Sequence, residues 1–555
     1  MMLVRWCVAG LCFITALPVA AQTSPPRQPA PGESTIVVNG GIEAKKSNWK
    51  RAESDHVIVY SDGSDAELKR VTNNLERLYT LMSRLYRKGD TSDDTAKLQV
   101  TLFDSARFFE KMDLQGQRWQ EGPYPPSFAG QRYYDPREDG EVLAVSRSDQ
   151  VIKLATKKAF DKECDKVLGE GGNCNEILPP VPTARSWESV LYSAFAQHFL
   201  LTYTRAVYPR WYVDGVGALF STMEVHGDGS IDYARAPDDY RQVFNAYGDL
   251  DVKAVLSGAY LEPSTTKTRV MDWTPYHAWL LAHFFTYSKL NPARALQFKA
   301  YMTAIHQGVP MAQAAKIFGD MRRLQSELNI YASNSTSYAR TAKHQPFGSD
   351  PLIATLSLGG AALIEAKIQL GSQGNADWIA GLRDKVAKIP HDADALLLLA
   401  EAECRAGQDE ACLAAAERVL AGTPDDARAL AWKGVALTNR AVAGAAADRA
   451  ATLADARKAI ARAIQADSQS PLALIAWFQS FTKAGEKVPE PAILGMARVI
   501  RQVPAAPAPR LYLGAELVRQ GNPELARNIL YPVLYGADDS PEKKAAQALF
   551  PATGR

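Results

Sequence analysis

The sequence has little excess of charge of either sign. Its 63 Lys and Arg residues nearly balance 61 Asp and Glu residues, which leaves a formal net charge of +2. No broad basic field therefore exists, and this argues against a nucleic-acid partner. Because 46% of the residues are hydrophobic and 9% are aromatic, the chain can bury sizeable cores, which excludes wholesale disorder. At 555 residues we expect a folded protein of several domains.

Long apolar runs are also missing, with one exception at the N-terminus. Arg5 precedes an apolar stretch over residues 7–19, and small residues lead up to Ala21. This order predicts a signal peptide over residues 1–21, with an uncleaved anchor as the alternative. Elsewhere no run approaches the roughly 20 apolar residues that a spanning helix needs. We therefore expect an exported protein, periplasmic or extracellular, with no transmembrane segment after cleavage and a Pro-rich leader over residues 22–44.

Cysteine is scarce, and two of the six cysteines fall in the predicted signal peptide. Export would place the other four in an oxidising compartment, where cysteines pair. One pair flanks a Gly-rich loop and the other flanks a turn at Gly407, so local bridges are favoured. Zinc binding is the alternative, but the spacing of two to four residues that zinc sites use is absent. We expect two disulfides, Cys164–Cys174 and Cys404–Cys412.

The N-terminal half mixes two hydrophobic periods. Alternating residues predict strands, and apolar residues at steps of three and four predict helices. This pattern gives a small strand–helix–strand lobe followed by a mostly helical lobe, which is an α+β region. The expected strands are residues 56–60, 98–103 and 142–145; the helices are 68–85, 187–203 and 276–287, followed by further helices within 292–330; a hairpin is expected over 223–233.

From about residue 350 the composition shifts to Ala and Leu with helical periodicity. Pro390 and Pro424 open two similar segments 34 residues apart, which is the tetratricopeptide period. The pattern predicts an all-α tetratricopeptide-like solenoid over residues 350–555, with turn glycines at Gly407, Gly485 and Gly521. An unrelated Ala-rich helical bundle is the alternative. A solenoid of this kind has a concave surface, so we expect a protein or peptide partner to bind the helical repeats.

Residues 187–220 read WESVLYSAFAQHFLLTYTRAVYPRWYVDGVGALF. This segment resembles the gluzincin-type, peptidase-MA-like zinc peptidase domain of exported bacterial proteins, and the resemblance extends over residues 45–335. Members of that family carry HExxH on one helix and a Trp-x-x-Glu-Gly segment at the start of the next. The resemblance implies two His ligands for one Zn²⁺, a Glu that activates the bound water, and a Glu as third ligand.

The chemistry of that family is missing from this sequence. The two His positions fall on Ser193 and Gln197, the Glu between them on Ala194, and the third ligand on Asp214. Ser and Gln are poor zinc ligands, and the alanine side chain has no group that could accept a proton from a metal-bound water. We therefore expect no zinc cofactor and no catalytic residues at these degenerate positions. Gln197 and Asp214 are expected to form a buried hydrogen-bonded pair, with Ser193 close to both.

The remaining histidines give no metal motif. His198 lies on an apolar helix and is interpreted as a hydrogen-bonded core residue, and His226, His277 and His283 lack ligand spacing. The acidic residues near the predicted hairpin lack the pattern of a calcium loop and are interpreted as a solvated turn; they are Asp228, Asp232, Asp238 and Asp239. No phosphate-binding loop or serine-hydrolase elbow occurs.

Two functions remain open. The first is a non-catalytic exported scaffold that binds a peptide or protein, built on an inactive zinc-peptidase-like domain and tetratricopeptide-like repeats. The alternative is an active hydrolase or metallopeptidase that uses an unrecognised site.

Overall fold

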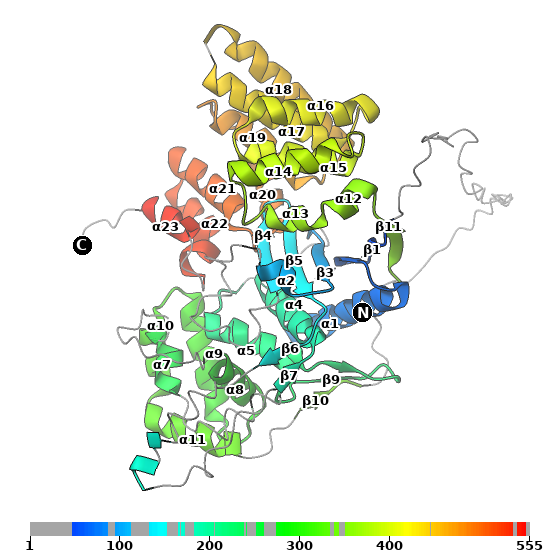
Figure 1. Ribbon diagram of the computed structural model, residues 1–555. Coiled ribbons are helices and arrows are strands. Elements are labelled where there is room, and N and C mark those ends of the chain that lie inside the picture. The colour runs from blue at the N-terminus through cyan, green and yellow to red at the C-terminus, as the bar shows by residue number, and fades with distance from the viewer. Residues whose placement is uncertain are drawn as a thin grey trace, which may run out of the picture. The chain divides into compact units, whose positions relative to one another are not determined.

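A computed structural model gives the fold (Figure 1). It describes residues 47–86, 95–110, 112, 132–152, 165–166, 168–171, 183–204, 206–237, 240, 251–259, 274–333, 338–342, 350–444, 446–536 and 541–550. The predicted signal peptide, the leader over 22–44, the Cys164–Cys174 bridge, Asp238 and Asp239 lie outside these residues. Among the described residues, no helix is both long enough and apolar enough to span a bilayer. Residues Ser47–Arg555 form one compact unit.

A six-stranded mixed sheet organises the N-terminal region. Its strand order is β11-β1-β2-β3-β5-β4, in which β2, β3 and β5 run parallel and the other pairs are antiparallel. The strands are β1 (Lys50–Glu53), β2 (Val57–Ser61), β3 (Leu98–Phe103), β4 (Arg132–Arg137), β5 (Gly140–Ser146) and β11 (Leu352–Thr355). The expected strands over 56–60, 98–103 and 142–145 are therefore confirmed within a residue or two.

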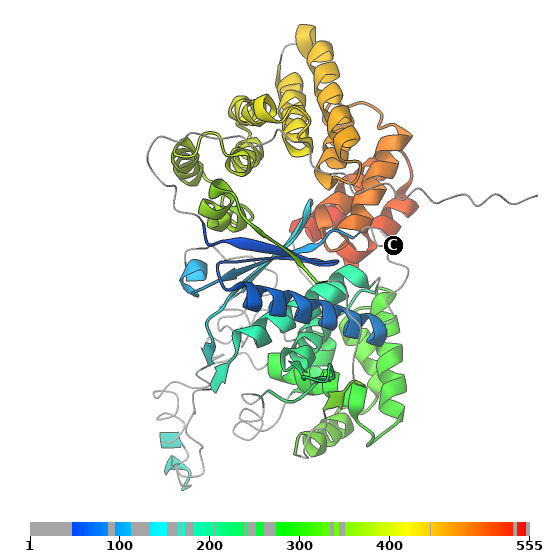
Figure 2. The ribbon, with the colours of Figure 1, turned by 90° about the vertical axis from the view of Figure 1, so that its right-hand side faces the viewer.

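The sheet is covered on both faces, as the alternation of its side chains requires. Val57, Val59 and Leu143 belong to the core shared with helices α1 (Asp65–Leu85) and α4 (Trp187–Tyr203). The alternate residues Tyr60 and Val142 belong to a second core on the other face, which includes residues of α13 (Ile364–Gln369). Figure 2 shows α1 and α4 on one side of the sheet and the yellow-green helices that begin with α12 and α13 on the other.

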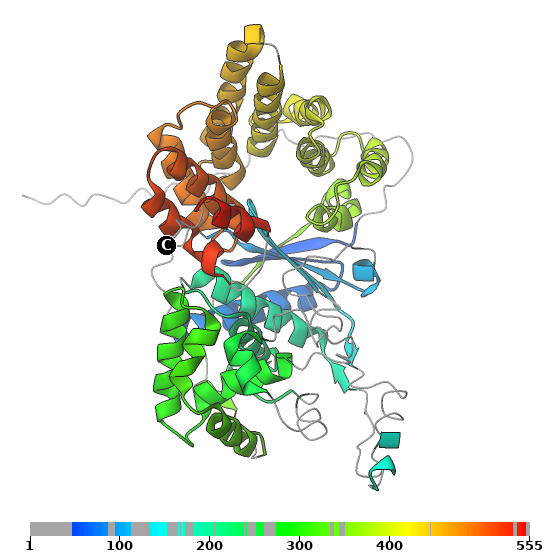
Figure 3. The same cartoon turned by 90° about the vertical axis from the view of Figure 1, so that its left-hand side faces the viewer.

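A mostly helical lobe follows the sheet, as expected. The predicted helix over 187–203 is α4, and the predicted hairpin is β8 and β9, which a third short strand extends. Figure 3 shows the helices of this lobe, in green, gathered side by side. The elements are α5 (Arg210–Ser221), β8 (Glu224–Val225), β9 (Ile231–Tyr233), α7 (Val252–Ser257), α8 (Thr274–Tyr287), α9 (Ala293–His306), α10 (Met311–Ala314), η4 (Ala315–Phe318), α11 (Met321–Ser333) and β10 (Ala339–Arg340); the smaller α2 (Arg107–Glu110), β6 (Gln150–Ile152) and β7 (Thr183–Arg185) precede them.

The C-terminal region is helical from Leu358 onward. Its first described residues differ from the expectation, because Leu352–Thr355 form β11 and pair with β1 at the edge of the sheet. The helices are α12 (Leu358–Ala362), α13, α14 (Ala376–Ala387), α15 (Ala393–Arg405), α16 (Asp409–Gly422), α17 (Ala427–Ala443), α18 (Ala446–Ala466), α19 (Pro471–Thr482), α20 (Glu490–Gln502), α21 (Pro507–Arg519), α22 (Pro523–Tyr535) and α23 (Pro541–Ala548).

Three glycines end helices of this region in the left-handed conformation. Gly407, Gly485 and Gly521 have φ angles of 72°, 74° and 82° and separate α15 from α16, α19 from α20, and α21 from α22. Glycine adopts positive φ without the steric cost that a Cβ brings, so it permits the sharp turn between consecutive helices. All three positions are those that the sequence predicts as turns.

The predicted bridge between Cys404 and Cys412 is present and joins α15 to α16 across the turn at Gly407. Cross-linking residues this close in the chain should stabilise the fold by about 2–3 kcal/mol. We expect the double substitution of Cys404 and Cys412 by alanine to lower the free energy of unfolding by that amount, as measured by urea denaturation. Substitution of Cys404 alone should cost as much, because it also removes the bond. Free thiols at both positions in a non-reducing mass spectrum would contradict the bridge.

Candidate functional site

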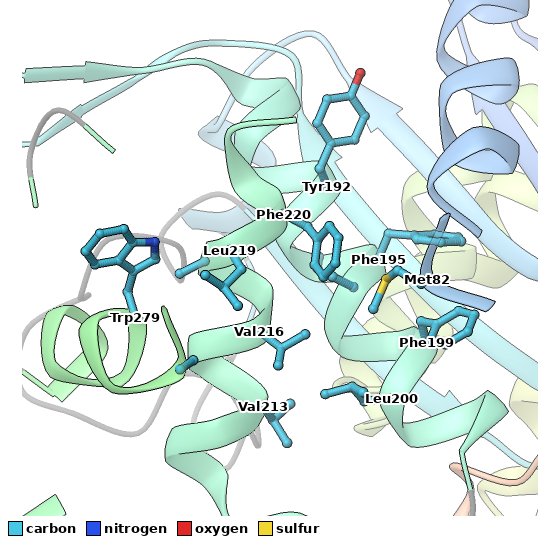
Figure 4. Close-up of a cluster of buried hydrophobic side chains, with 14 of the residues drawn as sticks. Met82, Tyr192, Phe195, Phe199, Leu200, Val213, Val216, Leu219, Phe220 and Trp279 are labelled. Carbon is cyan, nitrogen blue, oxygen red and sulfur yellow. The ribbon is translucent and has the colours of Figure 1, made fainter. Parts of the chain in front are cut away.

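The residues that the sequence resemblance aligns with a zinc site, Ser193, Ala194, Gln197 and Asp214, lie on two adjacent helices, α4 and α5. Helix α4 begins at the N-cap Ser186, whose hydroxyl accepts a hydrogen bond from the amide of Ser189. It carries few charged side chains and is buried on all sides between the sheet, α1 and α5. Figure 4 shows Leu200 of α4 between the two helices, close to Val213 and Val216 of α5. Tight packing therefore fixes the side chains on the facing surfaces.

Gln197 and Asp214 form the predicted pair. The side-chain amide of Gln197 donates a hydrogen bond of 3.0 Å from Nε2 to Oδ1 of Asp214. Gln197 is 5% exposed, so the bond satisfies a buried polar group. Each helix contributes one partner, and the bond ties α4 to α5 at the level where a zinc ligand set would have to lie.

Ser193 and Ala194 are fully buried beside this pair. A Cβ placed on Gly217 of α5 would lie 2.9 Å from Oγ of Ser193 and 2.9 Å from Cγ of Gln197, so Ser193 and Gln197 meet the same point of α5. The packing therefore brings Ser193 close to Gln197, and Gln197 bonds Asp214, whereas the approach of Ser193 to Asp214 stays a prediction. Ala194 is part of the hydrophobic core. The close approach of the helices at Gly217 leaves little room for imidazole rings at positions 193 and 197.

Arginine side chains that the sequence motif did not predict supply positive charge near Asp214. Nε of Arg210 lies 3.6 Å from Oδ2 of Asp214. Arg132 on β4 is buried, and burial lowers its pKa to about 10; Asp214 opposes this shift, whereas Arg210 and Arg185 add to it. Arg210 and Arg132 therefore both act on the carboxylate of Asp214, and Arg185 adds a further positive charge close to Arg132.

These residues do not fit Zn²⁺. A divalent cation needs several deprotonated ligands, and the described residues of this site offer one carboxylate that is already hydrogen-bonded to Gln197. The surrounding guanidinium groups would repel a second positive charge in a medium of low dielectric constant. No catalytic step through a metal is derived from this arrangement.

His198 is a core residue, as predicted from its apolar surroundings. Its Nδ1 lies 3.2 Å from the hydroxyl of Tyr134 on β4 and 3.2 Å from the hydroxyl of Thr202. Burial lowers the pKa of His198 to about 3, so the ring is neutral at physiological pH. His283 is likewise buried, and its Nδ1 lies 2.7 Å from the hydroxyl of Tyr331. Neither histidine belongs to a group of three or more potential metal ligands among the described residues.

A second cluster lies on the β8–β9 hairpin, where one ligand atom from each of Glu224, His226 and Asp232 falls within 4.8 Å of the others. Spacing along the sequence did not predict it, because the hairpin register places Glu224 opposite Asp232. Asp232 is already in ion pairs, at 2.5 Å to Nε of Arg340 and at 3.1 Å to Arg235. The hydrogen bond from Arg340 lowers the pKa of Asp232 to about 2.

The ion pairs explain this second cluster without a metal. Arg340 lies on β10, which pairs with β9, so its contact with Asp232 holds the third strand onto the hairpin. Arg235 also lies 3.5 Å from Glu224. The two guanidinium groups neutralise the carboxylates that a cation would need, so we assign the cluster a structural role.

No family model matches the chain, and no curated protein matches it. The site is therefore interpreted from its own residues.

Proposed function

We propose that this chain is an exported, non-catalytic scaffold that binds a protein or peptide. In this proposal it consists of a peptidase-MA-like region without a zinc site and a set of tetratricopeptide-like repeats. The observation that carries the proposal is the hydrogen bond between Gln197 and Asp214, with Arg210 beside it, at the positions of the metal ligands in the family that the sequence resembles. A bond between the buried amide of Gln197 and the partly buried carboxylate of Asp214 gives this place in the fold a structural role.

Repeated capping supports the assignment of repeats. Asp392 and Asp426, which lie 34 residues apart, are the N-caps of α15 and α17, and their carboxylates accept hydrogen bonds from Ala395 and Ala429 three residues on. Ser470 caps α19 in the same way. Equivalent caps at the family period, followed by glycine turns, are what stacked helix pairs of this kind need.

One part of the helical region contacts the chain's own sheet. The hydroxyl of Tyr512 on α21 donates a hydrogen bond of 2.6 Å to Glu138 in the β4–β5 turn. Burial raises the pKa of Glu138, and the charges of Arg405 and Lys483 oppose that shift. Arg405 of α15, Tyr512 of α21 and Lys483 just after α19 are engaged within the chain, so we expect a partner to bind other surfaces of the repeats.

The absence of catalysis is tested on the purified mature chain. We expect metal analysis after dialysis to find far less than one zinc per chain, and casein and a peptide panel to stay uncleaved with or without chelator. One tightly held equivalent of zinc together with chelator-sensitive cleavage would contradict the proposal and favour the alternative, an active metallopeptidase. Cleavage that the chelator does not inhibit would favour a hydrolase with an unrecognised site.

The binding half of the proposal needs its own experiment. The full chain is crosslinked in the compartment to which it is exported, and we expect a stoichiometric partner whose complex can be reconstituted from the two purified proteins. A chain that crosslinks to no protein and purifies alone would contradict a scaffold role.

A further inference from the structure

A cavity of about 330 Å³ lies on the face of the sheet opposite α4. Its walls come from the sheet on one side and from α12, α13, α15 and α17 on the other. The lining is rich in charged side chains of both signs. A volume of this order is at the lower end of the range for cavities that bind small molecules.

Most charges of the lining are paired within the protein. Arg137 donates a hydrogen bond of 2.7 Å to Asp135 and two more to the carbonyl groups of Lys367 and Ile368. Glu401 lies 2.9 Å from Arg405 and 3.4 Å from Arg428. These side chains hold the walls together and have little capacity left for a ligand.

Lys367 is a cation of the lining that has no ion pair. Its Nζ donates a hydrogen bond of 2.8 Å to Oε1 of Gln99 and lies 4.7 Å from the centroid of the Tyr60 ring. Both contacts are to neutral groups that fix the ammonium in place. No carboxylate of the described residues lies within ion-pair distance of it, although the side chain is partly buried.

Asp139 is the matching anion. It lies in the β4–β5 turn, is partly buried, and lines the same cavity. Among the described residues it has no hydrogen bond or close ion pair to its carboxylate, and Arg405 acts on it only as a more distant charge. A partly buried charge without a partner is costly, so a ligand that supplies the opposite charge gains from the contact.

We propose that this cavity binds a small zwitterion, a short peptide with free ends, through its carboxylate on Lys367 and its ammonium group on Asp139. Lys367 and Asp139 have opposite charges, no ion pair among the described residues, and a place in the same cavity, and these observations carry the assignment, because a ligand with one charge would satisfy only one of them. The site lies apart from α4 and α5 and does not depend on the scaffold function.

The test uses the purified mature chain and a ladder of probes, namely alanine and its di-, tri- and tetrapeptide, in isothermal titration calorimetry. We expect one length to bind best, because the separation of its charged ends must match that of the two side chains. N-acetylation or C-amidation of that peptide should weaken binding at least tenfold. Absence of binding by every member at millimolar concentration, or equal binding of the blocked forms, would overturn the proposal.

Two variants assign the ends of the ligand. Lys367→Met and Asp139→Asn should each weaken the best peptide at least tenfold, with Lys433→Met and Asp384→Asn as matched controls outside the cavity. Lys367→Met should leave the affinity of the amidated peptide unchanged, because that peptide has no carboxylate for Lys367 to bind. Asp139→Asn should likewise leave the affinity of the acetylated peptide unchanged. If circular dichroism shows that one variant does not fold, the other variant still tests the proposal. Its effect on the blocked peptides shows whether the assigned contact exists. Equal losses for all peptides on both variants would contradict the assigned contacts.

Discussion

Gly215→Ala is expected to lower the free energy of unfolding by about 3 kcal/mol, the upper end for overpacking a core. A Cβ at this position of α5 would lie 2.4 Å from the backbone oxygen of Ala278 and 2.8 Å from Cβ of Ala282, both on α8. The nearest atom belongs to the backbone of a packed helix, so relief requires α8 to move. The glycine that follows Asp214 is therefore needed for helix packing.

Gly381→Ala is the matched control for this prediction. Gly381 lies inside α14, and a Cβ there would meet no atom within 4 Å. Because alanine is the better helix former, this variant should gain about 0.5–1 kcal/mol. Urea denaturation followed by circular dichroism measures both variants. Midpoints that move in the same direction would show that the close approach of α5 and α8 at Gly215 is wrong.

Glu141→Gln is expected to stabilise the protein by a few kcal/mol at pH 8 and by much less at pH 5. Glu141 lies on β5 and is 0% exposed, and neither carboxyl oxygen has a hydrogen-bond partner of good geometry among the described residues. Thr202 and the backbone amides of Glu141 and Ala505 lie near the carboxyl and offset only part of the cost of burial. Burial raises the pKa of this carboxyl from 4.5 to about 8. The folded protein therefore keeps the proton over a pH range in which the unfolded chain has lost it.

The sign of the effect follows from proton binding. Between pH 4.5 and 8 the folded state binds more protons at Glu141 than the unfolded state does, so the stability of the wild type falls as pH rises through this window. Glutamine does not ionise and removes that loss. We expect the difference in melting temperature between variant and wild type to widen from pH 5 to pH 8. The control Glu365→Gln changes an exposed carboxylate on α13 and should show no such widening. A constant difference across the pH range would contradict a buried, protonated Glu141.

Local features of the fold were predictable because they depend on residues close in the sequence. The apolar run after Ser186 predicted α4, and the observed helix has the expected bounds. The turn at Gly407 and the bridge across it followed from a spacing of eight residues between cysteines. The pairing of Gln197 with Asp214 was predicted from the spacing of a known motif, which supplies the geometry of two adjacent helices.

The sequence alone was enough to predict the main helices, several strands, the turn glycines and the pair of Gln197 with Asp214. Only the tertiary structure decided that Arg132, from a strand far earlier in the chain, acts on Asp214, and that Lys367 and Asp139 line one cavity. The two kinds of feature differ in the distance along the chain over which the responsible residues interact. Hydrophobic period, caps and turn glycines act within a few residues. The juxtaposition of charges instead depends on strand order and on which helices cover each face of the sheet, and no local pattern specifies either.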